Sequence, residues 1–111
     1  MKIFVDIDET ICHTNGEKHL ARDYTTAVPI MENIEAVNRL FDEGHEITYW
    51  TARGTVSGID WYDTTKKQLE AWGAKHHSLI LGKPAYDLYI DDKSINTRSW
   101  EKLGRCIPEL L

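Results

Sequence analysis

The chain has 111 residues, a length that suits one domain built around a single hydrophobic core. Its 13 lysines and arginines are outnumbered by 18 aspartates and glutamates, which gives a formal net charge of −5. A protein that binds along the phosphates of DNA or RNA normally carries a basic surface, so this balance argues against a nucleic-acid partner. We therefore expect residues 1–111 to form one domain whose ligand is not a polynucleotide.

The first half of the chain predicts two strands and one helix. The run KIFVD, residues 2–6, is typical of a buried strand. A helix is expected between Pro29 and Gly44, because the apolar residues between them recur at helical spacing and both residues suit helix ends. The run EITYW, residues 46–50, follows as a second strand.

The second half predicts one more full helix, two strands and a short final helix. Asp60 suits the start of the helix and Gly73 its end. The runs SLIL, residues 78–81, and DLYI, residues 87–90, are typical of strands, and a short helix is expected over residues 98–103.

Strands that alternate with helices of this length indicate parallel strands joined by right-handed crossovers. The predicted fold class is therefore α/β: a Rossmann-like, three-layer α/β/α domain with a mostly parallel central sheet. Residues 11–28 have no such periodicity. A stretch of this length inside a small domain favours a functional flap, although a solvated loop is the alternative.

The N-terminal apolar run is too short for a signal sequence or a membrane span. Cys12 and Cys106 lack CxxC spacing, which indicates free thiols in a reducing compartment. We expect a cytoplasmic protein without a membrane partner.

Polar residues follow the apolar strands at the points where the strands end. Because ligands of open parallel sheets bind beyond the carboxyl ends of the strands, these residues should converge. They are Asp6, Asp8, Thr51, Lys83, Asp91 and Asp92. Three or four carboxylates without a useful histidine or cysteine set favour Mg²⁺, and a lysine and a hydroxyl suit phosphoryl oxygens. Together these groups predict phosphoryl transfer.

Four segments resemble the ordered motifs of the haloacid dehalogenase superfamily, in its phosphatase branch. They are DIDET at residues 6–10, the threonine of YWTARG, the lysine of LGKP and the acidic pair of LYIDD. The match spans residues 2–92, which is most of the chain. The intervals that hold a cap domain in that superfamily are short here, so the resemblance implies a capless member. In its length and in the residues of these motifs, the chain is similar to the small phosphatases of capsule and surface-polysaccharide biosynthesis.

The resemblance implies that Asp6 is the nucleophile, which forms an aspartyl-phosphate that water hydrolyses. Asp8 would protonate the leaving oxygen and later deprotonate the water. Thr51 and Lys83 would bind the phosphoryl group, and Thr10 would support the first loop.

The resemblance also implies a Mg²⁺ site formed by Asp6, the backbone carbonyl of Asp8 and Asp91, with Asp92 as a direct or water-mediated ligand. Each motif also has an ordinary structural interpretation. An Asp-x-Asp pair often forms a turn, and Asp91 and Asp92 suit a helix cap. For Arg53, a contact with substrate and a structural salt bridge are both open.

We expect a small phosphorylated metabolite, in particular a sugar phosphate, as substrate and a homo-oligomer that encloses the open site, with Lys18, Arg22 and Tyr24 of the flap as substrate contacts. Two alternatives stay open: a polynucleotide-end or nucleotide phosphatase of the same superfamily, and a non-catalytic phosphate-binding module. The sequence does not separate a hydrolase from a phosphotransferase.

Overall fold

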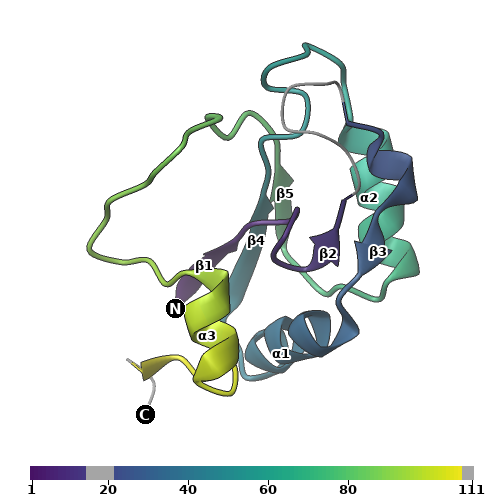
Figure 1. Cartoon of the computed structure of the whole chain (residues 1–111). Helices are drawn as coiled ribbons and strands as arrows, with labels where there is room; N and C mark the ends of the chain where they lie inside the picture. Colours follow the sequence, from purple (N-terminus) through teal and green to yellow (C-terminus); the bar gives the residue numbers. More distant parts are fainter. Residues whose placement is uncertain (15–21, 109–111) are drawn as a thin grey trace.

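The computed structural model describes residues 1–14 and 22–108, and the elements follow the alternation that the sequence predicts (Figure 1). In chain order they are β1 (Lys2–Val5), β2 (Cys12–His13), the 3₁₀ helix η1 (Tyr24–Thr26), β3 (Val28–Pro29), α1 (Met31–Asp42), β4 (Glu46–Trp50), α2 (Tyr62–Ala71), β5 (Ser78–Ile80) and α3 (Thr97–Lys102).

The main sheet has three parallel strands in the order β1-β4-β5. Its register places Phe4 beside Thr48 and Tyr49 beside Leu79, so the central strand, β4, pairs along both edges. Helices connect β1 to β4 and β4 to β5, which is the arrangement of a Rossmann-like α/β fold. The predicted Rossmann-like α/β class and its parallel sheet are confirmed.

The hydrophobic core lies on one face of this sheet. Ile47 and Tyr49 lie two positions apart in β4 and are fully buried, so they point to the same face. They pack in one cluster with Ile34 and Val37 of α1 and Leu69 of α2. Both helices therefore cover that face.

The opposite face of the sheet keeps apolar side chains in contact with solvent. Phe4 is 58% exposed and Ile80 is 44% exposed, and the ring of Phe4 packs edge-on against that of Trp50, 5.7 Å away. We expected helices on both faces of the sheet. At Phe4 and Ile80 the second face has no such cover.

The helix boundaries agree closely with the sequence patterns. α1 begins two residues after Pro29, and Gly44 follows its end with a φ of +97°, a conformation in which glycine is favoured. Asp60 accepts a 2.9 Å hydrogen bond from the backbone N–H of Tyr62 at the start of α2. Gly73 lies beyond the end of α2.

The fourth predicted strand, residues 87–90, does not form. After β5 the chain runs through a long loop that projects from the sheet and returns at α3 (Figure 1). We call its outer part, residues 87–95, the arm. Leu88 is 76% exposed and Ile90 is 90% exposed, so the strand-like sequence has no neighbour to pair with.

The predicted flap has structure of its own at both ends. β2 and β3 form a small antiparallel sheet in which Cys12 lies beside Pro29. Of the predicted flap contacts, Lys18 lies outside the described residues. In the described part of the chain there is no cap domain, and none of its helices has the length and apolar character that crossing a bilayer requires.

Candidate functional site

The site begins in the tight turn that follows β1. The backbone N–H groups of Thr10 and Ile11 both donate to the carbonyl of Ile7, at 3.1 and 2.9 Å. Glu9 has a φ of +61°, a left-handed conformation that is uncommon for a residue with a side chain. This turn reverses the chain directly beyond the strand and leaves Asp6 and Asp8 at the carboxyl end of the sheet.

Asp6 forms an ion pair with Lys83, with 3.4 Å between Oδ1 and Nζ. The two residues are 77 positions apart, and the sheet brings them together because β1 and the segment after β5 end at the same edge. Burial raises the pKa of Asp6 above its ordinary value, and the charge of Lys83 and the N–H of Ile7 offset only part of this effect. The predicted nucleophile and the predicted phosphate-binding lysine are therefore direct neighbours.

Lys83 is held in place by its backbone and by two aromatic rings. Its N–H donates to the carbonyl of Thr51 at 3.1 Å, and its ammonium lies 5.6 Å from the ring centre of Trp50 and 5.3 Å from that of Tyr86. Burial acts to lower the pKa of Lys83, but Asp6 and Tyr86 outweigh it, so the pKa is raised. The lysine stays positively charged beside the carboxylate.

Asp8 faces the other side of the site and is bound by Arg53. The guanidinium of Arg53 is fully buried, and its Nη2 lies 2.9 Å from Oδ1 of Asp8. Arg53 also donates to the side chains of Thr65 and Gln68 on α2, at 3.1 and 2.6 Å. Of its two open interpretations, the structural salt bridge is the one observed.

The two predicted threonines are part of the framework of the site. Thr51 is 1% exposed, and its hydroxyl oxygen accepts a 3.1 Å hydrogen bond from the backbone N–H of Arg53. The hydroxyl of Thr10 lies 2.8 Å from that of Thr97, which connects the first turn to α3. Thr10 thus lies where the support of the first loop was predicted.

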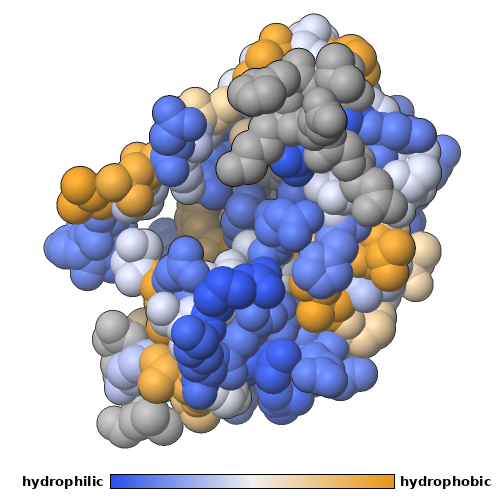
Figure 2. Space-filling view, in the orientation of Figure 1, coloured by the Kyte–Doolittle hydropathy of each residue, from blue (hydrophilic) through white to orange (hydrophobic). Residues whose placement is uncertain are grey.

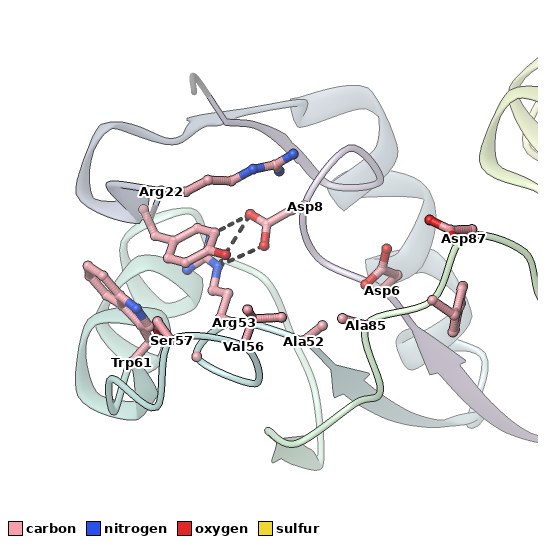
Figure 3. Close-up of a pocket in the computed structure, with 13 residues that line it drawn as sticks. Asp6, Asp8, Arg22, Ala52, Arg53, Val56, Ser57, Trp61, Ala85 and Asp87 are labelled. Atoms are coloured by element: carbon pink, nitrogen blue, oxygen red, sulfur yellow. Dashed lines mark hydrogen bonds and ion pairs between the residues drawn. The ribbon is translucent and has the colours of Figure 1, made fainter. Parts of the chain in front are cut away.

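A cavity of about 690 Å³ opens beside these residues. In Figure 3, Asp8 points toward Arg53, whereas Asp6 lies near Ala85 and Asp87. The two described flap residues that we predicted as substrate contacts both line the cavity. Its lining residues are Asp6, Asp8, Arg22, Tyr24, Ala52, Arg53, Gly54, Val56, Ser57, Trp61, Ala85, Tyr86 and Asp87.

Some lining residues were not predicted. Trp61, Tyr86 and Asp87 were not among the predicted site residues, and Asp87 was expected to begin the strand over residues 87–90. The sequence signal for the latter two is their closeness to Lys83, three and four positions before them.

The predicted metal ligands are assembled only in part. Asp6 and Asp8 lie at the site, but Asp91 and Asp92 are exposed residues of the arm, and Asp91 accepts a 3.1 Å bond from the N–H of Lys93 in a local turn. Among residues 1–14 and 22–108, no three histidines, cysteines, aspartates or glutamates lie close enough together to hold a metal. Mg²⁺ usually keeps several water ligands and binds one or two carboxylates, so Asp6 and Asp8 are the predicted ligands that this conformation brings to the site.

Comparison with known proteins supports the fold. No family model matches the chain, and no curated protein matches it. Among solved structures, the chain is similar to the crystal structure of an MCSG target from Vibrio cholerae, with 24% sequence identity over 95% of both chains and a TM-score of 0.77. At this identity the match shows a shared fold.

Proposed function

We propose that the protein is a phosphomonoester hydrolase of the haloacid dehalogenase type that acts on a small phosphorylated metabolite. The observation that carries this proposal is the contact between Asp6 and Lys83 at the carboxyl end of a parallel sheet, beside an open cavity. A carboxylate next to a fixed ammonium provides a nucleophile for phosphorus and a positive charge for the phosphoryl oxygens.

In the first step, a carboxylate oxygen of Asp6 forms a bond to phosphorus while the bond from phosphorus to the leaving oxygen breaks. Lys83 offsets the negative charge on the phosphoryl oxygens. The leaving oxygen takes up a proton from Asp8, across the cavity. In the second step, Asp8 takes a proton from water, whose oxygen attacks phosphorus and restores the Asp6 carboxylate.

Arg53 is a positioning residue in this scheme. It contacts Asp8 through two nitrogens and is itself fixed by Thr65 and Gln68. The bidentate contact fixes the orientation of the Asp8 carboxylate, which a proton transfer to a substrate oxygen requires.

The proposal includes Mg²⁺ as the cofactor, with Asp6 and Asp8 as the ligands that one chain supplies at the site. A bound cation would offset the charge that accumulates where a carboxylate meets a phosphate dianion.

The lining of the cavity supports a small polar substrate. Arg22 supplies a cation, and the rings of Tyr24 and Trp61 pack edge-on with their centres 5.1 Å apart. We propose a sugar phosphate of polysaccharide precursor synthesis in the cytoplasm. Because the same aromatic side chains also suit a nucleobase, a nucleotide phosphatase is the second candidate.

The test is phosphate release from an aryl phosphate, measured with Mg²⁺ and with EDTA. Wild type should turn over only with the metal, and Asp6→Asn should lose activity by several orders of magnitude. Asp63→Asn, an identical change on the exposed surface of α2, serves as the matched control and should keep wild-type activity. An inert wild type would favour a phosphate-binding module instead, and an Asp6→Asn variant as active as wild type would show that Asp6 is not the nucleophile.

A substrate panel then decides the class. Preferential hydrolysis of sugar phosphates supports the proposal, whereas nucleotides or phosphorylated DNA ends as preferred substrates favour the second candidate.

A further inference from the structure

The lining of the cavity contains two arginines, and they differ in their freedom to meet a ligand. Arg53 is fully buried, and all of its N–H groups donate to neighbours, which are Asp8, Thr65, Gln68 and the sulfur of Cys12. Arg22 is only half-buried, and its Nη1 donates to the hydroxyl of Thr14 at 3.1 Å, which uses one of several N–H groups. No ion pair joins Arg22 to a carboxylate among residues 1–14 and 22–108.

Arg22 lies on the side of the cavity that faces away from the proposed nucleophile. In Figure 3, Asp6 lies to one side of Asp8, and Trp61 lies to the other side, with Arg22 above it. In the proposed reaction phosphorus binds at Asp6, and the leaving oxygen takes its proton from Asp8. The rest of the leaving group therefore extends beyond Asp8, toward Arg22 and Trp61.

An aromatic wall stands beside Arg22 and is fixed before any ligand binds. It consists of Tyr24 and Trp61, whose rings pack edge-on. The carbonyl of Tyr24 accepts a 2.6 Å hydrogen bond from the side chain of Gln68, and the Tyr24 ring lies over Arg53. Burial raises the pKa of Tyr24 and the charge of Arg22 acts against this effect, so the guanidinium lies close to the phenol.

The cavity suits a compact polar ligand. Its volume of about 690 Å³ is in the range of small-molecule sites. The exposed apolar residues of the arm do not take part, because Leu88 and Ile90 are absent from the lining, and Figure 2 shows hydrophobic residues at the outer end of the projecting loop. A single sugar ring that packs against the aromatic wall fits this description.

The charges in the cavity favour a carboxylate at Arg22. One guanidinium matches the single charge of a carboxylate and binds it with two parallel hydrogen bonds. A second phosphate group carries more negative charge and would need a further cation. Arg53 does not supply it, because its guanidinium is already paired with Asp8.

We propose that the leaving group of the substrate is a sugar acid, with its carboxylate bound by Arg22 and its ring packed against Tyr24 and Trp61. Arg22 is then a specificity-determining residue, which selects the acid over the neutral sugar of the same shape. This contact lies away from the reacting atoms and is the same in the ground state and the transition state, so it lowers KM more than it raises kcat. The inference rests on the proposed phosphatase function.

Two matched pairs of sugar phosphates test the selection. Glucuronic acid 1-phosphate and glucose 1-phosphate differ only at C6, where one has a carboxylate and the other a hydroxymethyl group. Galacturonic acid 1-phosphate and galactose 1-phosphate form the second pair. We expect wild type to show a higher kcat/KM for the acid of at least one pair, by about tenfold to a hundredfold, as hydrogen bonds to a charged group allow. An active wild type that prefers the acid in neither pair, or hydrolyses none of the four compounds, overturns the sugar acid.

Variants of Arg22 test the residue itself. Arg22→Gln should bring the ratio of kcat/KM for acid and neutral sugar close to one, mainly by raising KM for the acid. Arg22→Lys keeps the charge without the two-pronged geometry and should restore part of the ratio. Arg39→Gln, an identical change on the exposed surface of α1, is the matched control and should keep the wild-type ratio. An Arg22→Gln enzyme that still prefers the acid shows that another residue selects it.

Glucose 1,6-bisphosphate distinguishes the two possible anions at Arg22. A kcat/KM above that of glucuronic acid 1-phosphate would assign a second phosphate to Arg22 and reject the carboxylate. A lower value supports the sugar acid.

Calorimetry separates this inference from the proposed phosphatase activity. If wild type releases no phosphate even from the aryl phosphate, the phosphatase is rejected, and the binding of glucuronic acid 1-phosphate and glucose 1-phosphate is measured instead. Tighter binding of the acid that Arg22→Gln abolishes would retain Arg22 as the carboxylate-binding residue of a binding module. Equal binding of the two compounds would reject the inference together with the phosphatase.

Discussion

Arg53 donates hydrogen bonds to the carboxylate of Asp8 from two nitrogens, Nη2 at 2.9 Å from Oδ1 and Nε at 3.1 Å from Oδ2 (Figure 3). The guanidinium has no exposed surface, and the ring of Tyr24 lies over it, 4.7 Å away. A buried guanidinium destabilises the folded state unless it has partners, because it has lost its hydration and only ion pairs and hydrogen bonds can replace it.

Truncation of either member of this pair should therefore destabilise the fold. Arg53→Ala leaves the partly buried Asp8 without its counterion, so we expect the free energy of unfolding to fall by about 3–5 kcal/mol. Urea denaturation measures this loss. The control is Lys75→Ala, which removes an exposed 2.8 Å ion pair with Asp42 and should cost less than about 1 kcal/mol. Equal losses in the two variants would contradict a structural role of Arg53.

The raised pKa of Asp6 makes stability depend on pH. The unfolded carboxyl ionises near 3.8, whereas the folded one holds its proton to higher pH. Between these two values the folded state binds more protons, so this group's stabilising contribution is full below 3.8 and is lost as pH rises through the folded pKa. Asp6→Asn does not titrate, and it should gain stability relative to wild type across that window.

Urea denaturation of wild type and Asp6→Asn at a series of pH values from 3.5 to 7 measures this difference. A difference between the two proteins that stays constant over this range would show that the carboxyl is not perturbed. The acid limb of the activity profile should also lie above 3.8, because attack on phosphorus requires the ionised carboxyl.

Gly54 allows the loop that carries Arg53 to turn tightly. Its φ is +82°, and a Cβ atom at this position would overlap the carbonyl oxygen of Ile59. Gly58, with a φ of +75°, has open space at the same place. Gly54→Ala should therefore lower the melting temperature clearly more than Gly58→Ala, whose cost is limited to the left-handed backbone, about 1–2 kcal/mol. Similar melting temperatures would show that the loop relaxes around the new methyl group.

The two cysteines should differ strongly in reactivity. Cys12 is fully buried, and burial together with the charge of Asp8 raises its pKa to about 12. At pH 8 its thiolate fraction is on the order of one in ten thousand, whereas Cys106 is exposed. A disulfide reagent should modify one thiol per native chain quickly and the second only after unfolding. Cys106→Ser should abolish the fast phase, and a fast phase that persists would show that Cys12 is accessible.

Local patterns predicted the elements that local interactions define. The strand Glu46–Trp50 agrees residue by residue, and α1 and α2 lie between the breakers that the sequence places around them. A helix makes its hydrogen bonds within one segment, so its own residues specify it. The central strand, β4, was also predicted correctly, because both of its edges pair with strands of the same chain and one of its faces lies in the core.

The arm departs from its sequence pattern because a strand exists only with a partner. DLYI has the composition of a strand, but no neighbour in the described chain pairs with it. The pairing of Arg53 with Asp8 lay equally beyond sequence reasoning, since 45 positions separate the two residues. By contrast, Asp6 and Lys83 were predicted to converge. Each follows a predicted parallel strand, and residues in that position meet at the carboxyl end of the sheet.

The exposed arm also has a consequence for the chain before it folds. Leu88, Tyr89 and Ile90 form an apolar triplet of the kind that nucleates intermolecular β-aggregates, but such segments usually need five to seven uncharged residues. Asp87 stands on one side of the triplet and Asp91 directly on the other. These charges act as gatekeepers, so the segment that stays uncovered in a single copy is kept soluble during synthesis by the carboxylates next to it.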